Sequence, residues 1–568
     1  MNRNRYRLKV HDRYQVEIKF EYPISKDRPR ESFRVDTYFY IPNSLGIRPD
    51  SYAQNEFYQD LQTYTRYGTP TIPLEALLDE KNDRSPFSRV AAQKQALLTG
   101  QGHAEAAQRV EYELRILGCI FRGETRAQGR RISVCLAKPG LHPKDFQDAA
   151  AMCGRFLAES TQVVAHLREL QRTFLIPNLP KHVDRAFRYV DESMSVQLES
   201  VCGKVYRSFA HVAEDAPVEA LEAARKLATA MQSEESYRRE AGYPTAVDTS
   251  NGPAAARSNE YFLYRIGVLK KYVQSTLFLS VEKHQGSRSL LYTIYATAAM
   301  GAMSFFVILL WLLQDIAPIN SIPYMFLAVV AYAFKDRIKE SLKRYFSERM
   351  TGILRDRESE LLDRAPSRSV VGRIAEAVSF LPLGRVPIAV QEKRAPDELF
   401  DLAEDSAPET IIKYQKTIEL YSDEVFKLHQ RVDHLNEIVR FNVRKLLVRM
   451  DDPKKGLSIS ESSDPEGWYP PEESGNGNKH AALTPLLRVR ATKVYHVNMI
   501  LGISVMNERG TWITDQEKFR LVLSRDGIER VETSGLVDAE SAEPTAFSGN
   551  YGVQKTPSGT FTSMNYEV

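Results

Sequence analysis

Residues 289–314 read SLLYTIYATAAMGAMSFFVILLWLLQ, and no side chain in this stretch is charged. An α-helix of this length, at about 1.5 Å per residue, crosses roughly 30 Å of hydrocarbon. A second uncharged run, IAPINSIPYMFLAVVAYAF, follows at residues 316–334, but prolines interrupt its start. We predict a two-helix transmembrane hairpin, with one helix at residues 289–314, a short non-cytoplasmic loop at 315–321 and a second helix at 322–338. The alternative is a hydrophobic hairpin buried inside a soluble protein.

The charges on either side of the hairpin predict its orientation. Lys and Arg are frequent on both outer flanks, whereas the loop at 315–321 contains neither. Cytoplasmic flanks of membrane helices are the ones enriched in Lys and Arg, so both long flanking regions are predicted to be cytoplasmic. The expected location is a plasma membrane, such as a bacterial inner membrane, with both termini in the cytoplasm and the lipid bilayer as a partner.

Small side chains recur along both predicted membrane helices, and such residues let helices approach closely in lipid. They are Thr293, Thr297, Gly301 and Ala302 on the first helix, and Ala328 and Ala331 on the second. We expect these residues to pack the two helices against each other. The alternative is self-association of several copies through the same face. Neither uncharged run contains an ionisable residue, so no proton or ion site is expected within the membrane.

The composition of the remaining chain is typical of globular cytosolic domains. The chain has 568 residues, which leaves room for several domains besides the hairpin. Its 76 basic and 73 acidic residues nearly balance, so neither nucleic acid nor an acidic substrate is expected as a partner. Four cysteines lie far apart, which suits a reducing compartment and predicts no metal site and no disulfide framework.

The segment before the hairpin is predicted to begin with strands and continue with helices. Apolar and polar residues alternate from Gln15 to Tyr22, so residues 1–48 are expected to form a β-hairpin region. Because two strands alone are only marginally stable, they must pack on the following helices or on strands from the far end of the chain. Residues 49–241 are predicted to form a cytosolic helical bundle, followed by a flexible loop at 242–257. An eleven-residue repeat from Val183 to Val212 predicts one long, nearly straight helix within the bundle.

Further units are predicted on both sides of the hairpin. They are two amphipathic stalk helices (258–288 and 339–363), a linker (364–408), a C-terminal β-containing domain (409–533) with a disordered insertion (451–478), and a disordered tail (534–568). The stalks carry apolar stripes at helical spacing. Asp526 and Gly527 give a strong β-hairpin signal, and the two disordered stretches are poor in apolar residues. The predicted fold class is therefore a membrane-anchored α+β protein.

No catalytic or cofactor motif is recognisable. The sequence contains no phosphate-binding loop, no dinucleotide fingerprint, no zinc-protease motif and no serine-hydrolase elbow, so it names no cofactor and no small-molecule substrate. His429 and His434 are five residues apart, which misses the spacing that puts two imidazoles on one helix face, and we expect both at the surface. Asp451 and Asp452 precede Pro453 and are expected to form a turn.

Two classes of function fit this organisation. The favoured one is a membrane-anchored cytoplasmic scaffold or sensor that binds a protein or ligand through its helical bundle and C-terminal β domain, without covalent chemistry. The alternative is a homo-oligomeric channel or transporter subunit in which small-residue packing of the helices lines or closes a pore. An enzyme whose site is assembled from scattered residues is a third class, because the absence of a motif does not exclude one.

Overall fold

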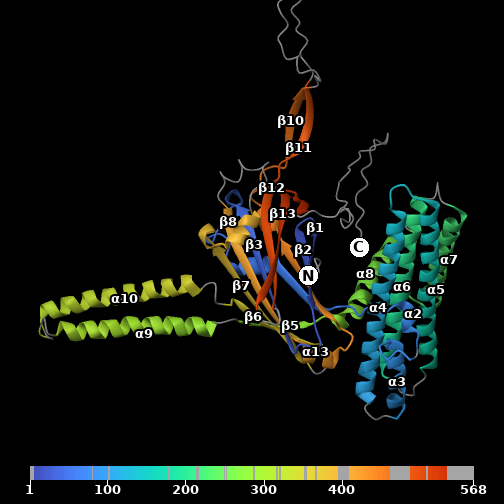
Figure 1. The fold of residues 1–568 in the computed structure, drawn as a ribbon, viewed down its shortest axis with the longest axis horizontal. Helices are drawn as coiled ribbons and strands as arrows, with labels where there is room; N and C mark the ends of the chain where they lie inside the picture. The colour runs from blue at the N-terminus through green and yellow to red at the C-terminus, as the bar shows by residue number, and fades with distance from the viewer. Residues whose placement is uncertain are drawn as a thin grey trace, which may run out of the picture.

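The structure is a computed structural model of the chain. It describes residues 6–533 except for gaps at 80, 100–102, 175–178, 213–216, 249, 251, 286–287, 315–317, 319–320, 351–354, 365–367, 395–408, 461–485 and 507–509. The described part contains a β-sandwich, a helical bundle and a projecting pair of helices (Figure 1). The mixed α+β class predicted from the sequence is therefore confirmed.

Two antiparallel sheets form the β-sandwich. The larger sheet has the strand order β14 (Gly527–Thr533), β13 (Trp512–Ser524), β12 (Tyr495–Met506), β3 (Arg30–Pro42), β8 (Glu409–Tyr421), β7 (Val370–Leu381), β6 (Arg357–Leu362) and β5 (Ser280–Gln285). The smaller sheet has the order β1 (Tyr6–Asp12), β2 (Gln15–Pro23), β9 (His434–Asn442) and β4 (Leu61–Tyr67). The sheets pack face to face, because the ring of Phe39 on β3 lies 4.9 Å from the ring of Phe441 on β9.

Strands from both ends of the chain share this sandwich. β3 lies between β8 and β12, and β2 pairs with β9. Of the two supports expected for the N-terminal strands, the structure has strands from the far end of the chain. The N-terminal β-hairpin region and the C-terminal β domain, which are predicted as separate units, therefore have one common core. The physical reason is that a strand leaves backbone N–H and C=O groups unpaired along both edges. The neighbouring strand β1 pairs with one edge of β2, but the other edge of β2 and both edges of β3 pair with distant strands.

A strand replaces part of the expected helical region. The short helix α1 (Gln54–Asp60) leads directly into β4, although residues 49–241 are expected to be helical. β4 pairs with β9, and its side chains Thr65 and Tyr67 are buried while Tyr64 is exposed. Alternating threonine and tyrosine suit a pleated, half-buried surface better than a helix.

The helical bundle is inserted between β4 and β5. Its helices are α2 (Leu74–Leu77), α3 (Pro86–Thr99), α4 (His103–Leu136), α5 (Pro143–Thr173), α6 (Lys181–His211), α7 (Val218–Glu240) and α8 (Pro253–Gln274). Leu114, Val190 and Leu198 are fully buried within it. The helix α6 is a single unbroken helix over the eleven-residue repeat, as predicted.

The last bundle helix, α8, differs from the expected stalk at 258–288. It ends at Gln274 and is followed by β5. Leu269 and Val273 are buried, and α8 contacts both α4 and α6. The apolar stripe that the sequence shows is therefore a packing face of the bundle. The preceding loop at 242–257 is held in part by Asn259, whose side chain accepts a hydrogen bond from Val247 N (2.8 Å) and donates one to Val247 O (2.7 Å).

The helices α9 (Arg288–Leu313) and α10 (Ile322–Met350) lie side by side and project from the edge of the larger sheet, between β5 and β6 (Figure 1). Among the described residues, one helical stretch, Tyr295–Leu313, is long and apolar enough to cross a membrane by length and composition. The second stalk expected at 339–363 is helical only in its first part, because β6 occupies its end.

Two other expected segments also contain regular structure. The linker expected at 364–408 contains β7 and the helix α11 (Ile388–Arg394). The insertion at 451–478 begins with β10 (Lys454–Ser460), which pairs with β11 (Leu486–Thr492) in a separate ribbon. Residues 461–478, and the tail at 534–568, lie outside the described residues, so these disorder predictions stay predictions.

Candidate functional site

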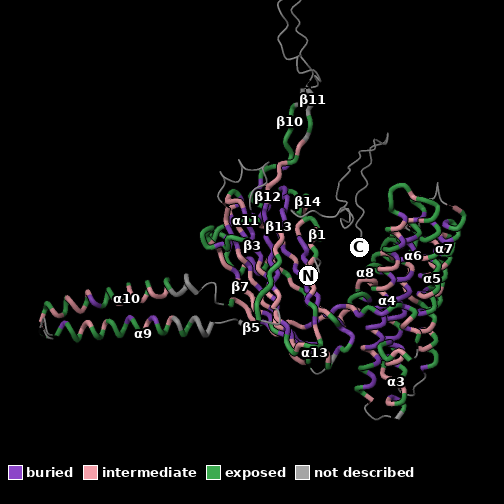
Figure 2. Tube along the Cα trace, viewed as in Figure 1, coloured by how far each residue is buried: buried purple, intermediate pink, exposed green. Residues whose placement is uncertain are grey.

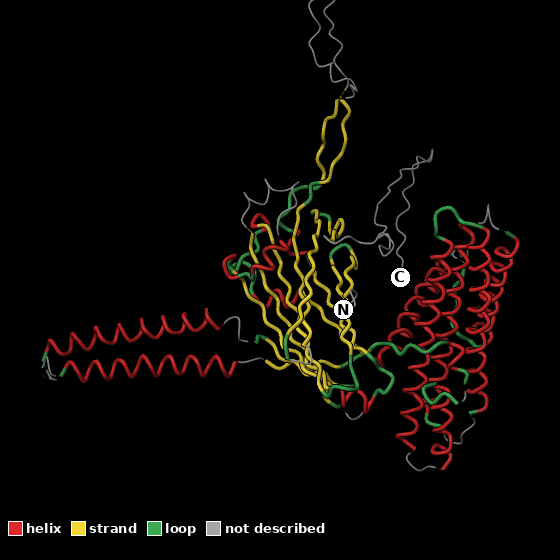
Figure 3. Tube along the Cα trace, in the orientation of Figure 1, coloured by secondary structure: helices red, strands yellow, loops and turns green. Residues whose placement is uncertain are grey.

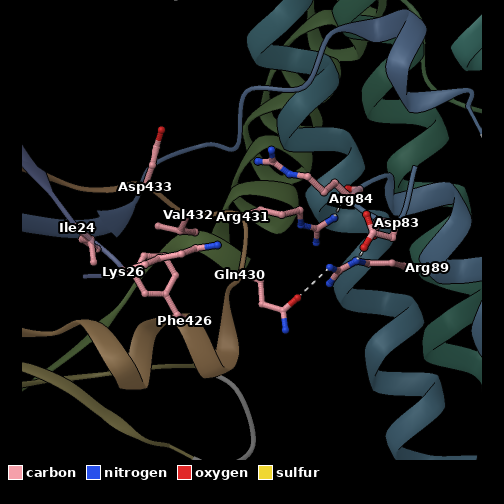
Figure 4. Close-up of a pocket in the computed structure, with 10 residues that line it drawn as sticks. All are labelled: Ile24, Lys26, Asp83, Arg84, Arg89, Phe426, Gln430, Arg431, Val432 and Asp433. Atoms are coloured by element: carbon pink, nitrogen blue, oxygen red, sulfur yellow. Dashed lines mark hydrogen bonds between the residues drawn. The ribbon is translucent and has the colours of Figure 1, made fainter. Parts of the chain in front are cut away.

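A pocket of about 410 Å³ lies where the sandwich meets the bundle (Figure 4). Three regions contribute to it: the segment after β2, the start of α3, and the helix α13 (Ser422–Leu428) with the segment that leads to β9. The lining residues are Ile24, Lys26, Asp83, Arg84, Arg89, Phe426, Gln430, Arg431, Val432 and Asp433. Small-molecule sites occupy about 300 to 1,000 Å³ and are frequent at domain junctions, so this pocket has a suitable size and place.

The lining of this junction pocket is more basic than acidic. Four of the lining residues are Lys or Arg and two are Asp. Arg89 is fixed by hydrogen bonds from Nε to Asp83 O (2.8 Å) and from Nη2 to Gln430 Oε1 (3.3 Å). Lys26 lies 5.5 Å from the centre of the Phe426 ring. Charged ammonium and guanidinium groups in the lining favour an anionic ligand, because they form strong hydrogen bonds with carboxylate or phosphate oxygens.

The floor of the pocket is a buried ion pair between the two bodies. Arg431 donates through Nη2 to both carboxylate oxygens of Glu113 on α4, at 2.9 and 2.7 Å, and through Nη1 to Arg84 O at 3.0 Å. Burial raises the pKa of Glu113, and the guanidinium groups of Arg431 and Arg89 oppose this shift. Removing Arg431 would leave Glu113 with only the longer contact to Arg89 Nη1 at 3.6 Å, so the pair contributes to holding the bundle on the sandwich.

A second polar network lies beside this floor and centres on His429. The Tyr112 hydroxyl is 2.6 Å from Nδ1 of His429, and Asp363 Oδ2 is 2.5 Å from Nε2. The Tyr67 hydroxyl also donates to Asp363 Oδ2, at 3.0 Å. These side chains come from α4, from the residue after β6, from the segment before β9 and from β4. The network therefore ties the bundle to both sheets.

We call this network of Tyr67, Tyr112, Asp363 and His429 the junction clasp, because it holds the bundle against the sandwich. His429, Asp363 and Tyr67 are buried, and burial raises the pKa of Tyr112 and Tyr67 well above the usual tyrosine range. Both hydroxyls therefore stay protonated at neutral pH and hold their acceptors. The expectation that His429 lies at the surface is wrong, because its partners come from distant segments that no local pattern reveals.

The other polar residues singled out in the sequence do not form a site. His434 is partly exposed, with Nδ1 2.5 Å from Asp433 Oδ1. Asp452 Oδ1 accepts a hydrogen bond from Lys454 N at 3.0 Å, which is the geometry of a turn. Across the part of the chain that the structure describes, no group of His, Cys, Asp and Glu residues could hold a metal ion.

The six predicted membrane-packing residues fall into two sets. Ala302 and Ala331 are buried between α9 and α10, and Ala328 is half-buried. By contrast, Thr293, Thr297 and Gly301 are exposed, and a Cβ added at Gly301 would meet no atom within 4 Å. The hairpin is thus packed through alanines, and the Thr297–Gly301 face points away from it.

Comparisons with protein-family models, with curated proteins and with solved structures found no match to this chain.

Proposed function

We propose that this chain is a membrane-anchored cytoplasmic sensor or scaffold, in which the α9–α10 hairpin is the anchor and the junction pocket binds the ligand. The observation that carries the proposal is that the hairpin exposes its large apolar side chains and buries small ones. Trp311 and Phe326 are 66% and 69% exposed, whereas the buried positions between the helices are alanines such as Ala302, 1% exposed. Figure 2 shows exposed and half-buried residues along both helices. Contiguous apolar surface of this kind is unstable in water and stable in lipid.

The apolar surface covers both helices, which supports a paired insertion. Large exposed apolar side chains on α9 include Met300 and Ile308, and those on α10 include Ile322 and Val329. At the inner limit of the apolar part of α10, Lys335 Nζ lies 3.7 Å from the centre of the Tyr332 ring. A lysine that folds over an interfacial aromatic ring in this way keeps its stem in apolar surroundings and its charge toward water.

A continuous path connects the pocket with the anchor, which supports the sensor role over a passive anchor. Arg431 in the pocket floor is two residues from His429, and His429 contacts Asp363. Asp363 directly follows β6, the strand that receives the chain from α10. Asp363 lies at the end of β6 opposite to the hairpin, so a ligand that moves Arg431 would act on the hairpin through the length of this strand.

Thiol labelling tests the anchor. In a Cys135→Ser background, the other native cysteines are buried, so added cysteines report alone. We expect a membrane-impermeant maleimide, applied from the non-cytoplasmic side of sealed membranes, to label Ile322→Cys at the hairpin tip and to spare Ala137→Cys and Leu383→Cys. If Ile322→Cys is not labelled from the non-cytoplasmic side, the hairpin does not cross the membrane. If all three added cysteines are labelled equally in protein from the soluble fraction, the anchor proposal is overturned.

A ligand screen tests the pocket. Purified protein in detergent is tested by thermal unfolding against anionic compounds, namely dicarboxylates, nucleotides and short acidic peptides. A compound that uses the pocket stabilises the wild type and fails to stabilise Lys26→Glu/Arg84→Glu. The control is Lys144→Glu, which reverses an exposed charge on α5 and should leave the stabilisation unchanged. If every compound that stabilises the wild type also stabilises the pocket variant equally, the pocket is not the binding site.

One observation favours the alternative of a homo-oligomeric channel or transporter subunit. The exposed Thr297–Gly301 face is small and unobstructed, and faces of this kind let helices of different copies approach closely. Its test is the Gly301→Leu variant described below.

A further inference from the structure

Four basic residues meet beside α4 without acidic partners. The helices α4 and α8 run antiparallel. Arg115 on α4 contacts Ser275 just after α8, and Cys119, one turn later on α4, contacts Val273, which is earlier in the chain than Ser275. Cys119 Sγ donates to Val273 O at 3.4 Å, and a Cβ at Gly118 would lie 2.8 Å from Val273 Cγ1. Arg122 lies one turn after Cys119 on α4, and Lys270 lies one turn before Val273 on α8. Because the helices are antiparallel, these two bases come opposite each other. Arg126 follows Arg122 on the same face of α4, four residues further on.

The strand β4 brings the fourth base to the same turn of α4. The backbone of Arg66 forms a β-bridge with Phe278, just after α8. A Cβ at Gly123 would lie 3.7 Å from Thr69 Cγ2, so the end of β4 rests against α4 next to Arg122. We call Arg66, Arg122, Arg126 and Lys270 the basic cluster. It is separate from the junction pocket, which none of these residues lines.

The basic cluster differs from two partly buried arginines of the bundle, Arg168 and Arg265, in having no counter-charge. Arg168 binds Asp191 and Glu234, and Arg265 binds both oxygens of Glu192. Within the described residues, the members of the basic cluster form no salt bridge, and Arg122 Nη1 donates only to the neutral amide of Gln197, at 2.7 Å. The Nε atoms of Arg66 and Arg122 are buried and have no hydrogen-bond partner.

The electrostatics of the cluster agree with its geometry. Burial, followed by the charge of Arg126, lowers the pKa of Arg122 to about 10. Desolvation of its ammonium, and then the nearby Arg122 and Arg126, lower the pKa of Lys270, although Lys270 is exposed as a residue. Cys119 supplies no charge, because burial raises the pKa of its thiol to about 12. Like charges are held together here at a cost that a bound anion would remove.

We propose that the basic cluster binds a phosphate-bearing anion. Guanidinium groups offer two parallel N–H donors to a phosphate, and the two unpartnered Nε atoms are donors of this kind. A phosphate group carries enough negative charge and enough acceptor oxygens to engage several of the four cations together. The phosphate belongs either to a soluble molecule or to a lipid headgroup. The hairpin lies on the far side of the sandwich from α4 and α8, which favours the soluble source (Figure 1).

The test uses the full chain in phosphatidylcholine nanodiscs with inorganic pyrophosphate as the probe. Titration calorimetry and thermal unfolding should both detect binding to the wild type. The variant Arg126→Gln/Lys270→Gln changes two exposed residues, so it should fold, and it should bind about tenfold or more weakly, since loss of one charge-assisted hydrogen bond alone has that effect. Without any phosphate and at low salt, the same variant should unfold at a higher temperature than the wild type, because charge repulsion is relieved.

Two controls separate this site from others. Arg109→Gln removes an exposed arginine elsewhere on α4, and Lys144→Glu reverses an exposed charge on α5; both should bind pyrophosphate like the wild type. A second arm replaces pyrophosphate with nanodiscs that contain phosphatidic acid, and binding only there would assign the phosphate to a lipid. Absence of binding in both arms, or binding that Arg126→Gln/Lys270→Gln retains in full, would overturn the proposal.

Discussion

The β-sandwich and the α9–α10 hairpin bury opposite kinds of side chain. Between its sheets the sandwich encloses Lys416 and Glu437, which are 2% and 0% exposed. The hairpin encloses alanines and turns its aromatic and branched residues outward. The sandwich therefore has a charge pair at its centre, whereas the hairpin has an apolar outer surface. The sheets of the sandwich shield its charge pair from water, whereas the large apolar side chains of the hairpin lie exposed on the single chain.

The buried charges of the sandwich form a cross-sheet connection. Lys416 Nζ on β8 hydrogen-bonds Glu437 on β9 and lies 3.6 Å from Glu376 Oε1 on β7. The Tyr22 hydroxyl donates to Glu437 Oε2 at 2.8 Å, and the Tyr414 hydroxyl donates to Glu376 Oε1 at 2.5 Å. Every charge therefore has a partner. Such a pair specifies one register of the sheets, and it is vulnerable to loss of either member.

Breaking this pair should give the largest effect. Replacing Lys416 with Met leaves Glu437 charged and buried without its cation, so we expect a loss of about 3 to 5 kcal/mol in the free energy of unfolding. Chemical denaturation of the detergent-solubilised protein measures it. The double variant Lys416→Met/Glu437→Met should recover much of this loss, because the lone charge is gone. A single variant as stable as the wild type would show that the pair is not buried.

The hairpin should respond to bulk rather than to charge. Ala302→Leu places a large side chain between α9 and α10, and overpacking of this kind costs about 1 to 3 kcal/mol. We expect the helices to separate, with faster proteolysis of the hairpin in detergent and unchanged unfolding of the sandwich. Ala302→Ser, which changes little volume, is the control. Unaltered proteolysis of Ala302→Leu would contradict the observed helix packing.

A variant in the junction clasp should have a smaller effect on the free energy of unfolding. Tyr112→Phe removes only the hydroxyl that meets His429 Nδ1, so we expect a loss of about 1 kcal/mol. Its distinctive readout is hydrogen exchange in β4 and in the segment before β9, which should increase while the exchange of the bundle interior stays the same. Tyr206→Phe, a change at an exposed tyrosine of α6, should leave both unchanged.

An ion pair on the outer face of the smaller sheet, between Glu17 on β2 and Arg440 on β9, should contribute a smaller, pH-dependent stabilisation than the buried pair. Burial alone would raise the pKa of Glu17, but hydrogen bonds from Arg440 on β9 and from Lys9 lower it below the usual 4.5. The stabilisation is therefore present above pH 4.5 and is lost as the pH falls through the folded-state pKa. In acid titrations followed by circular dichroism, Glu17→Gln should be less stable than the wild type at neutral pH and should lose less stability below pH 4.5.

The smallest effect on the single chain is expected at Gly301. Gly301 is exposed and a Cβ added there meets no atom within 4 Å, so we expect Gly301→Leu to leave insertion and unfolding unchanged. If several copies pack through this face, the added side chain must separate them and forfeit dispersion contacts. Oligomer size in detergent, measured by light scattering, and activity or partner recruitment in cells distinguish the cases. Intact insertion together with a smaller oligomer and lost function would favour the channel alternative over the sensor.

Local patterns predicted individual elements well. The apolar run at 289–314, the helix that became α6, and the turn at Asp526-Gly527 between β13 and β14 all appear in the structure. Each depends on neighbours within a few residues, through side-chain periodicity or turn geometry. The segment from Leu435 to Met450 fits both a helix and a strand by periodicity. Backbone pairing with β2 and β4 makes its first part β9, and only the residues from Arg444 to Leu447 form a helix.

The sequence by itself determined the apolar run at 289–314, the long helix α6 and the turn at Asp526-Gly527, because each depends on local periodicity or turn geometry. The tertiary structure alone decided that the first and last strands share one sandwich, that the stripe on α8 packs within the bundle, and that His429 and Arg431 meet Tyr112 and Glu113. The reason is physical. Strand pairing and buried polar contacts satisfy backbone and side-chain groups across hundreds of residues, and the energy of such contacts depends on burial, which no local spacing of residues records.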